Sequence, residues 1–366
     1  MVQSSGSTFG RVVRSAGPAG VAGQRESASA SASYSHSTSF LSAIKKNLNL
    51  ALIVLNIDHH RQGSVPELGN RAAARFRHAW DQSSMRICAD GAANRLHDSL
   101  TSSEREFMLP DLITGDLDSL RDDVAQYYGD RGVSIQRDPA QDSHDFEKCL
   151  RWLERREVDE VAVAAAAAAG GGDGGGDGVG LGGVVRSSDV GSAAAAPAAN
   201  PPPPKGQQQQ QRQQEQQQKR VLTPQPPPQG GGGGGGATRA PMSVVAFGAF
   251  GGRLDQQMAN LNMAYYSFGG AFESLYLVSD DSLAFVLAPG VHTIEINPDE
   301  EDGTCGLVPL GGACQRVVTS GLRWDLAGDV PLEFGGLISS SNEFARPTIT
   351  VETDAPLLWT TGLRRG

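Results

Sequence analysis

The sequence predicts an α/β fold, with an N-terminal α/β domain built on a mainly parallel sheet and a C-terminal antiparallel β-sandwich domain. Between about residues 40 and 280, short apolar runs alternate with helical patterns, as in a Rossmann-like sheet with helices on both faces. After about residue 281, period-two runs such as VHTIEI and TITVETDAPLLWT are separated by Gly, Pro and Asp turns, which is typical of antiparallel strands.

Four apolar runs are the expected strands of the parallel sheet. LNLALIVLN ends at Asn56, MRICAD ends at Asp90, and DLIT leads to Asp116. SVVAFG leads to a glycine-rich loop that precedes Arg253 and Asp255. Each run is short, rich in β-branched or large apolar residues and followed by polar residues, so we expect buried strands.

Two helices are expected from apolar residues at helical spacing. In QDSHDFEKCLRWLERRE, with Asp142 or Ser143 as N-cap, the apolar positions at i, i+3, i+4 and i+7 are Phe146, Cys149, Leu150 and Leu153. In GGRLDQQMANLNMAYY the apolar positions at i, i+4, i+7 and i+11 are Leu254, Met258, Leu261 and Tyr265.

Composition excludes several classes of protein. The 366 residues carry a net charge of −10 with a pI near 5.2, which argues against non-specific binding to nucleic acid or to an anionic membrane. No apolar run reaches the ~18 residues of a membrane span, so we expect a soluble, cytoplasmic protein. Its four cysteines form neither a CxxC pair nor a zinc pattern, which favours a reduced compartment with buried thiols: Cys88, Cys149, Cys305 and Cys314.

Two segments are expected to lie outside the folded core. Residues 1–39 are rich in Ser, Ala and Gly, with Arg11, Arg14 and Arg25, which suits either a disordered tail or an organellar transit peptide. Residues 164–240 contain Ala, Gly, Pro and Gln tracts and are expected to be a disordered insertion. The predicted domains are therefore 40–280, interrupted by 164–240, and 281–366.

Polar residues follow the expected strands at the edge where open α/β sheets bind ligands. They are Asn56, Asp90, Asp116, Asp118 and the loop 248–255, with Asp145 in the first turn of its helix. Neighbouring carboxylates repel unless a cation, a basic partner or full solvation compensates them. An all-oxygen cluster suits Mg²⁺ with substrate phosphates, although any single strand-end acid could simply be a solvated cap.

Three further segments could contact a substrate. The loop GAFGGRLD opens a helix, so its backbone N–H groups and Arg253 could approach phosphate, although it is neither a Walker loop nor GxGxxG and could be a tight turn. Trp324 could stack on a flat cationic ring, but a strand tryptophan is more often core. The stretch from Ser339 to Asn342 offers hydroxyl and amide groups or forms an ordinary turn.

The order of these motifs resembles eukaryotic thiamine pyrophosphokinase from about residue 48 to 361, apart from the insertion. The motifs are CADGAANRL, GDLDS, QDSHDFEKCL, GGRLDQQMANLN, TSGLRWDL, LISSSNEF and VETDAPLLWT. The resemblance implies a Mg²⁺-dependent enzyme that transfers the pyrophosphoryl group of ATP to the hydroxyethyl group of thiamine. It also implies a homodimer with the active site between subunits, an ATP-binding α/β domain and a thiamine-binding sandwich.

The resemblance also assigns roles to individual residues. It implies metal and catalytic roles for Asp116, Asp118 and Asp145, and a catalytic role for Asp255. It implies ATP contacts for Asp90, Asn94, Gln141, Gly252 and Arg253, and thiamine contacts for Trp324, Ser339 and Asn342. One position departs from the family, because His144 stands where a threonine usually precedes the helix aspartate; it could donate to phosphate or be exposed.

Three other functions stay open from the sequence. A related pyrophosphokinase acting on a pterin alcohol shares the acidic loops, but the C-terminal domain with Trp324 argues against it. A catalytically silent thiamine- or nucleotide-binding module is disfavoured because a pure binder gains nothing from crowded acids. A nicotinamide-binding domain is disfavoured by the missing GxGxxG.

Overall fold

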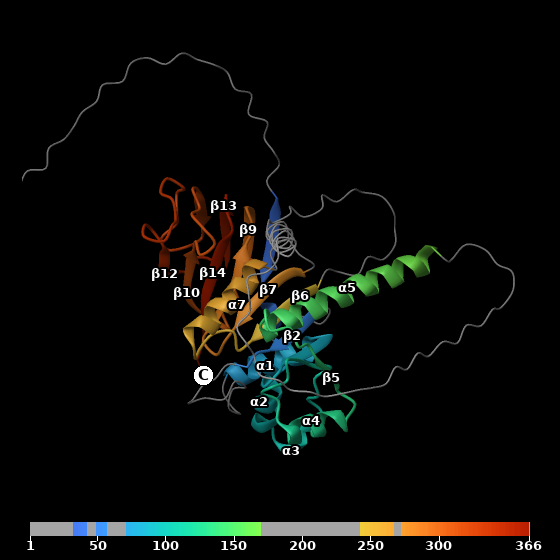
Figure 1. Ribbon diagram of the computed structural model, residues 1–366. Coiled ribbons are helices and arrows are strands. Elements are labelled where there is room, and N and C mark those ends of the chain that lie inside the picture. The colour runs from blue at the N-terminus through green and yellow to red at the C-terminus, as the bar shows by residue number, and fades with distance from the viewer. Residues whose placement is uncertain (1–31, 42–48, 57–70, 170–241, 267–271, 366) are drawn as a thin grey trace, which may run out of the picture.

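The computed structural model describes residues 32–41, 49–56, 71–169, 242–266 and 272–365 (Figure 1). In these ranges the strands form a ten-stranded sheet of order β12-β10-β14-β8-β7-β6-β2-β3-β4-β5 and a four-stranded sheet of order β1-β9-β13-β11. The α/β part lies at one end of the large sheet and the β-sandwich at the other. The predicted fold class is confirmed.

The α/β end of the large sheet is parallel. Its strands are β2 (Leu50–Val54), β3 (Met85–Ala89), β4 (Leu112–Gly115), β5 (Ser134–Arg137), β6 (Met242–Phe247) and β7 (Phe272–Val278). Its helices are α1 (Arg71–Gln82), α2 (Ala92–Ser99), α3 (Ser102–Arg105), α4 (Asp122–Gly129), α5 (Asp145–Ala169) and α7 (Leu254–Tyr266). This arrangement places the strand-end loops on one edge, as the sequence predicts.

Alternation along the strands divides the core between two faces. In β2, Leu52 and Val54 face the side covered by α1, α2 and α4. Ala51 and Ile53 face the opposite side, against α5 and α7. Because both of its faces are buried, β2 is apolar throughout rather than alternating with polar residues. Helices α5 and α7 contact each other on their side of the sheet.

The β-sandwich shares the large sheet with the α/β part. Its strands are β8 (Ser282–Leu287), β10 (Glu301–Val308), β12 (Ser339–Glu343) and β14 (Leu357–Leu363) in the large sheet, and β9 (Gly290–Glu295), β11 (Val317–Ser320) and β13 (Thr348–Thr353) in the small one. Strand β8 pairs with β7, so the large sheet continues across the boundary predicted near residue 281. Trp359 is completely buried in the sandwich core.

Strand β1 (Ser33–Ser37) lies in the region that the sequence assigns to a disordered extension, residues 1–39, and the 3-10 turn η1 (Ser39–Leu41) begins at the end of that region. The strand pairs in parallel with the edge strand β9. Aromatic stacking also holds the strand, since the rings of Tyr34 and His36 both stack with the ring of His292. The ordered chain therefore starts earlier than expected, and residues 1–31 lie outside the described ranges.

Helix α5 contains the apolar positions expected from its spacing, and all four are buried. The helix continues to Ala169, so residues 164–169, expected in the low-complexity insertion, are helical. The rest of the predicted insertion, residues 170–240, lies outside the described ranges. In α7 the expected apolar face is only partly buried, because Leu254 and Met258 are exposed. The helix is anchored instead by Leu261, Met263 and Ala264, and by Asn260, which donates to the Ala249 carbonyl at 2.9 Å.

The four cysteines are free and buried, as predicted. Within the described ranges, no helix combines the length and the apolar character needed to cross a bilayer.

Candidate active site

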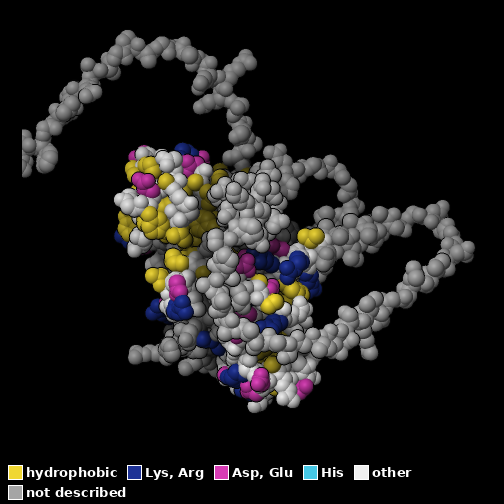
Figure 2. Space-filling view, viewed as in Figure 1, with side chains coloured by type: hydrophobic (Ala, Val, Ile, Leu, Met, Phe, Trp, Pro, Cys, Tyr) yellow, Lys and Arg dark blue, Asp and Glu magenta, His cyan; other side chains and the backbone are white. Residues whose placement is uncertain are grey.

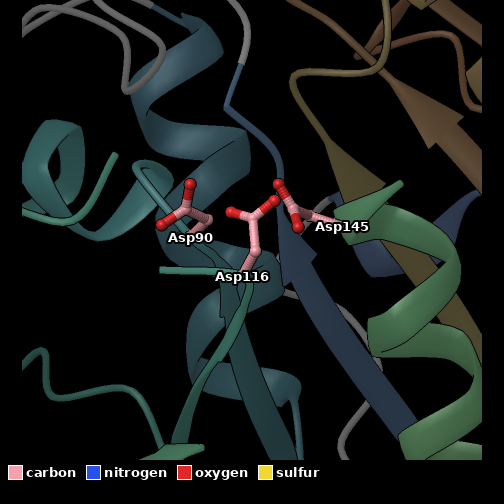
Figure 3. Close-up of side chains that lie close together, drawn as sticks. All are labelled: Asp90, Asp116 and Asp145. Carbon is pink, nitrogen blue, oxygen red and sulfur yellow. The ribbon is translucent and has the colours of Figure 1, made fainter. Parts of the chain in front are cut away.

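Three carboxylates meet at the edge of the parallel sheet (Figure 3). Asp90 follows β3, Asp116 follows β4, and Asp145 opens α5. Each contributes an oxygen to a set in which all members lie within 4.8 Å of one another. We call these residues the acidic group. The adjacent strand ends bring the first two together, and the start of the helix brings in the third.

Gly115, the last residue of β4, lets the acidic group assemble. A Cβ atom at this position would lie 2.8 Å from Cβ of Asp90 and 2.9 Å from Oδ1 of Asp145. Both distances are too short for real atoms, so any larger residue would push the two acids apart. The loops are also strained, because Asp90 has φ of 45° and Leu117 has φ of 61°. Strain of this kind in non-glycine residues is concentrated at functional sites.

Asp90 is the most deeply buried member, with 2% of its surface exposed. Its Oδ2 accepts from the Ser119 backbone N–H at 3.3 Å, whereas its Oδ1 is buried without a hydrogen-bond partner among the described residues. Burial, reinforced by the charge of Asp145, raises the pKa of this carboxyl. A buried oxygen without a partner is costly, and a bound cation would satisfy it.

Lys148 supplies a positive charge inside the same site. Its side chain is 1% exposed, and Nζ donates to Asp145 Oδ1 at 3.1 Å and lies 3.7 Å from Asp116 Oδ2. Burial opposes the charged form, but the hydrogen bond to Asp145 and the charges of Asp145 and Asp116 outweigh it, so the pKa of Lys148 is raised. The crowded acids therefore have a basic partner, while Oδ1 of Asp90 keeps no partner among the described residues.

Two of the expected acids lie outside the acidic group. Asp118 is exposed; its backbone N–H donates to Asp116 at 3.3 Å and its carboxylate accepts from the Ser119 hydroxyl at 2.9 Å. Asp255 is exposed and pairs with Arg253, whose Nε lies 3.0 Å from Oδ1. This hydrogen-bonded pair lowers the pKa of Asp255.

A pocket of about 110 Å³ adjoins Asp145. Its lining comes from the ends of β2 and β3, the start of α5 and the first turns of α7: Leu55, Asn56, Ala89, His144, Asp145, Phe146, Gln256, Ala259 and Asn260. His144, whose role the sequence leaves open, is half-buried, and burial lowers its pKa. Asn56 accepts from Arg95 at 2.7 Å, which fixes the amide beside this pocket.

The residues expected around thiamine lie together in the sandwich, with Trp324 in the loop that follows β11 and with Ser339 and Asn342 on β12. Trp324 is 52% exposed, with the guanidinium of Arg323 4.6 Å from its ring centre. The amide of Asn342 accepts from the Trp324 N–H at 3.2 Å and donates to its carbonyl at 2.8 Å. Ser339 lies 3.4 Å from the same amide. Asn342 is buried, so it positions the tryptophan while the ring stays open to a ligand.

The chain matches two family models in sequence order. The model described as "Thiamin pyrophosphokinase, catalytic domain" matches residues 76–170, and "Thiamin pyrophosphokinase, vitamin B1 binding domain" matches residues 291–358. The chain belongs to the thiamine pyrophosphokinase family. The first match runs from α1 to the end of α5 and includes the acidic group, and the second covers most of the β-sandwich.

Curated relatives and solved structures agree with this family. The chain is 27% identical to thiamine pyrophosphokinase 1 of Arabidopsis thaliana, over 78% of this chain and 80% of the relative. It is 27% identical to thiamine pyrophosphokinase of Saccharomyces cerevisiae, over 74% of each chain. The crystal structure of the yeast enzyme superposes with a TM-score of 0.60 at 22% identity, covering 90% of this chain and 91% of that chain. The Candida albicans structure gives 0.56 at 19% identity, covering 90% and 93%, and both show the same fold.

The remaining residues expected at the ATP side of a thiamine pyrophosphokinase have different surroundings. Asn94 donates to the Ser119 carbonyl at 2.7 Å and accepts from the Arg121 N–H at 3.1 Å, so it holds the loop that follows β4. Gln141 is exposed, and its side chain donates to the Pro139 carbonyl of its own turn at 3.4 Å. Gly252 has φ of 66°, a backbone conformation that glycine adopts without strain.

Two residues at the acidic group were not predicted from the sequence. Lys148 stands three positions after Asp145 in DFEK, and this i, i+3 spacing on a helix is the signal that could have found it. Gly115, between the apolar run and Asp116, carries no signal without knowing which side chains approach it. Asp90 was expected as an ATP contact, and the structure places it in the acidic group.

Proposed function

We infer that the chain is a thiamine diphosphokinase, which transfers the pyrophosphoryl group of ATP to the hydroxyethyl group of thiamine and yields thiamine diphosphate and AMP. The observation that carries this inference is the pair of matched family models, one catalytic and one for vitamin B1 binding, on the two parts of one fold. The match over residues 291–358 also disfavours a pterin alcohol as the acceptor.

The acidic group fits a hard divalent cation. Its donors are all carboxylate oxygens, and the buried Oδ1 of Asp90 lacks a partner among the described residues. We propose that Asp116, Asp145 and Asp90 hold Mg²⁺, with Asp118 close by on the same loop. When bound, Mg²⁺ would neutralise charge on the phosphate oxygens.

The side chains of the protein would orient the two substrates. Arg253 and the backbone N–H groups of loop 248–255 are proposed to contact the triphosphate, because an exposed guanidinium beside glycines can approach phosphate closely. Gln141 and Asn94 would complete the nucleotide side, with Asp255 orienting Arg253 through their ion pair. Attack by an alcohol on phosphorus through a loose transition state needs alignment more than a strong base.

We propose that the Trp324 ring stacks on the positively charged thiazolium ring of thiamine. Its exposed face and the fixing of its backbone by Asn342 support this role. The neighbouring guanidinium of Arg323 would have to leave the ring when a cationic ligand binds, because two cations on one face repel each other. Ser339, beside Asn342, is proposed to complete this side of the site.

We further propose that two copies of the chain form a homodimer with the active site at their interface. Hydrophobic side chains gather on the surface of the sandwich part (Figure 2), and its exposed large apolar residues are Trp324, Val330, Phe334 and Leu337. Burial of such a surface against a second copy would remove it from water. Light scattering on the protein as it elutes from a size-exclusion column measures its mass, and we expect the mass of two chains.

We propose a cytoplasmic location for the protein. Organellar targeting by the N-terminal residues is the alternative, and imaging of a fluorescent fusion protein would reveal it.

Mass-spectrometric product analysis tests the proposed function. Purified protein is incubated with ATP and Mg²⁺ in three reactions that contain thiamine, a hydroxymethyl pterin or no alcohol. We expect thiamine diphosphate and equimolar AMP in the first reaction and neither product in the third. Faster turnover of the pterin would make the chain a pterin-alcohol pyrophosphokinase, and tight binding of both substrates without AMP would make it a silent binding module.

A further inference from the structure

We propose that Lys148 is a built-in counter-ion that makes divalent metal binding at the acidic group depend on the nucleotide. The free protein would bind the metal weakly, and the metal would become tightly held only together with the triphosphate. This inference rests on the proposed function, because it assumes that the acidic group serves a metal–nucleotide complex.

The position of Lys148 is fixed by the fold. It lies one turn after Asp145 on α5, and this helix packs on β3 and β4 through Cys149 and Leu150. The side chain is 1% exposed, so its ammonium group has left bulk water and depends on the acids for compensation. It is therefore a permanent part of the site and not a mobile surface charge.

The ammonium group occupies the oxygens that a metal would use. Nζ contacts Asp145 Oδ1 at 3.1 Å and lies 3.7 Å from Asp116 Oδ2. The positive charge of Lys148 offsets one negative charge of the acidic group. A divalent ion that enters alone must share these oxygens with Lys148 and is repelled by its charge. The phosphates of a nucleotide bring further oxygens and negative charge, which offset this repulsion.

The unpartnered Oδ1 of Asp90 indicates that Lys148 compensates the site only in part. The lysine contacts two of the acids, and the third keeps a buried oxygen without a partner among the described residues. A site fully neutralised by lysine would not need a metal, and a site without lysine would bind a metal in the absence of substrate. The observed arrangement lies between these two cases.

The test is a titration with Mn²⁺, followed by electron paramagnetic resonance, on the wild-type protein and on Lys148→Met. Mn²⁺ takes the same oxygen ligands as Mg²⁺, and methionine keeps a similar unbranched shape without charge. Without nucleotide, we expect Lys148→Met to bind Mn²⁺ roughly tenfold more tightly than wild type. With a non-hydrolysable ATP analogue present, we expect the two proteins to differ by less than about threefold.

Two control variants separate charge in the site from charge elsewhere. Lys148→Arg keeps the positive charge and should retain weak Mn²⁺ binding. Arg151→Met removes a charge from the same helix outside the acidic group, because Arg151 is 40% exposed and pairs with Glu147. This variant should leave Mn²⁺ binding unchanged. Lys148→Gln replaces Lys148→Met if circular dichroism shows that the methionine variant is unfolded.

Two outcomes overturn the inference. One is tight Mn²⁺ binding by the wild-type protein without nucleotide. The other is Mn²⁺ binding by the folded uncharged variants that is equal to or weaker than that of wild type, as a purely structural lysine would produce. The titration requires no turnover, so absence of thiamine diphosphate in the product assay contradicts the proposed function separately.

Discussion

At the scale of single residues, the acidic group depends on a glycine and on two strained backbone positions. Gly115 leaves the space in which Asp90 and Asp145 approach each other, and Asp90 itself adopts a positive φ. The protein thus accepts local strain where three like charges meet, as expected of a site that is completed by a ligand.

Gly115→Ala is expected to abolish most of the activity while the fold persists. The added methyl group would separate two members of the acidic group, so we expect kcat to fall at least about 100-fold. Overpacking should also cost about 1–3 kcal/mol of unfolding free energy. Steady-state kinetics and urea unfolding measure the two effects. Gly132→Ala is the control, because Gly132 also has positive φ but has open space around its Cβ position; full activity of Gly115→Ala would contradict the role assigned to this glycine.

Asn342→Ala is expected to impair thiamine use more than ATP use. The substitution leaves the backbone N–H and carbonyl of Trp324 without their partner, which costs about 1–3 kcal/mol, and loosens the tryptophan. We therefore expect KM for thiamine to rise about tenfold while KM for ATP changes less than about twofold. Trp324→Ala should show the same pattern; equal increases in both KM values would argue against a positioning role.

The candidate site could be predicted only in part from the sequence. Asp116 and Asp145 could be found because parallel strand ends and helix starts share one edge of the sheet. The side-chain direction of Asp118 could not be predicted, because the preceding residue, Leu117, has a positive φ that changes the course of the loop. Lys148 was missed because its burial depends on how α5 packs on the sheet.

At the scale of elements, strand β1 shows how a weak sequence signal can form a defined contact. In SYSHS only the ring-bearing residues Tyr34 and His36 face the sandwich, and both stack with His292 of β9. His36 and His292 also share a hydrogen bond of 2.9 Å. Long apolar strands and amphipathic helices could be predicted from periodicity, whereas β1 could not, because its pairing partner lies more than 250 residues away.

The buried His36 should make stability fall in mild acid. Burial, and to a smaller extent the charge of His292, lowers the pKa of His36 to about 3. An unfolded histidine titrates near about 6.5, so as pH falls from about 6.5 towards 3 the unfolded chain takes up a proton that the folded protein excludes. The unfolding free energy should therefore decrease by up to about 1.4 kcal/mol per pH unit in this window.

His36→Phe is expected to remove this contribution. Phenylalanine keeps a ring against Phe285 and His292 but does not titrate. Nearby Glu301 is buried and its pKa is raised, so its protonation favours the folded state as pH falls. Because both proteins contain Glu301, the difference between their unfolding free energies at each pH isolates the contribution of His36. Urea unfolding from pH 7 to pH 5 makes the comparison; parallel pH curves for the two proteins would show that His36 does not titrate on unfolding.

At the scale of the whole molecule, one sheet and one buried arginine join the two parts. The ten-stranded sheet runs from β5 in the α/β part to β12 in the sandwich. Arg75 of α1 is completely buried and donates to Glu300 at 3.1 Å, to the Arg364 carbonyl at 3.0 Å and to the Asp280 carbonyl. We therefore expect the two parts to unfold cooperatively. The two domains predicted from the change in hydrophobic pattern near residue 281 are therefore more closely connected than expected. This pattern carries no information on strands that pair across the boundary.

Arg75→Met is expected to destabilise the whole molecule by about 3–5 kcal/mol, because removal of one partner leaves buried carbonyls and a partly buried carboxylate without compensation. Chemical denaturation followed by tryptophan fluorescence measures the loss. Arg77→Met is the matched control on the same helix: its partner Glu104 is partly exposed, so the cost should stay below about 1 kcal/mol. Similar losses for both variants would contradict the role of Arg75 in joining the two parts.

The central claim is that the acidic group at the strand ends carries out pyrophosphoryl transfer to thiamine. Asp116→Asn tests it most directly, because asparagine keeps the size of the side chain and removes a charge from that group. We predict that the variant keeps the circular dichroism spectrum and the melting temperature of the wild type but forms thiamine diphosphate at least about 1,000-fold more slowly. Thiamine diphosphate formation by the folded variant at the wild-type rate would contradict the claim.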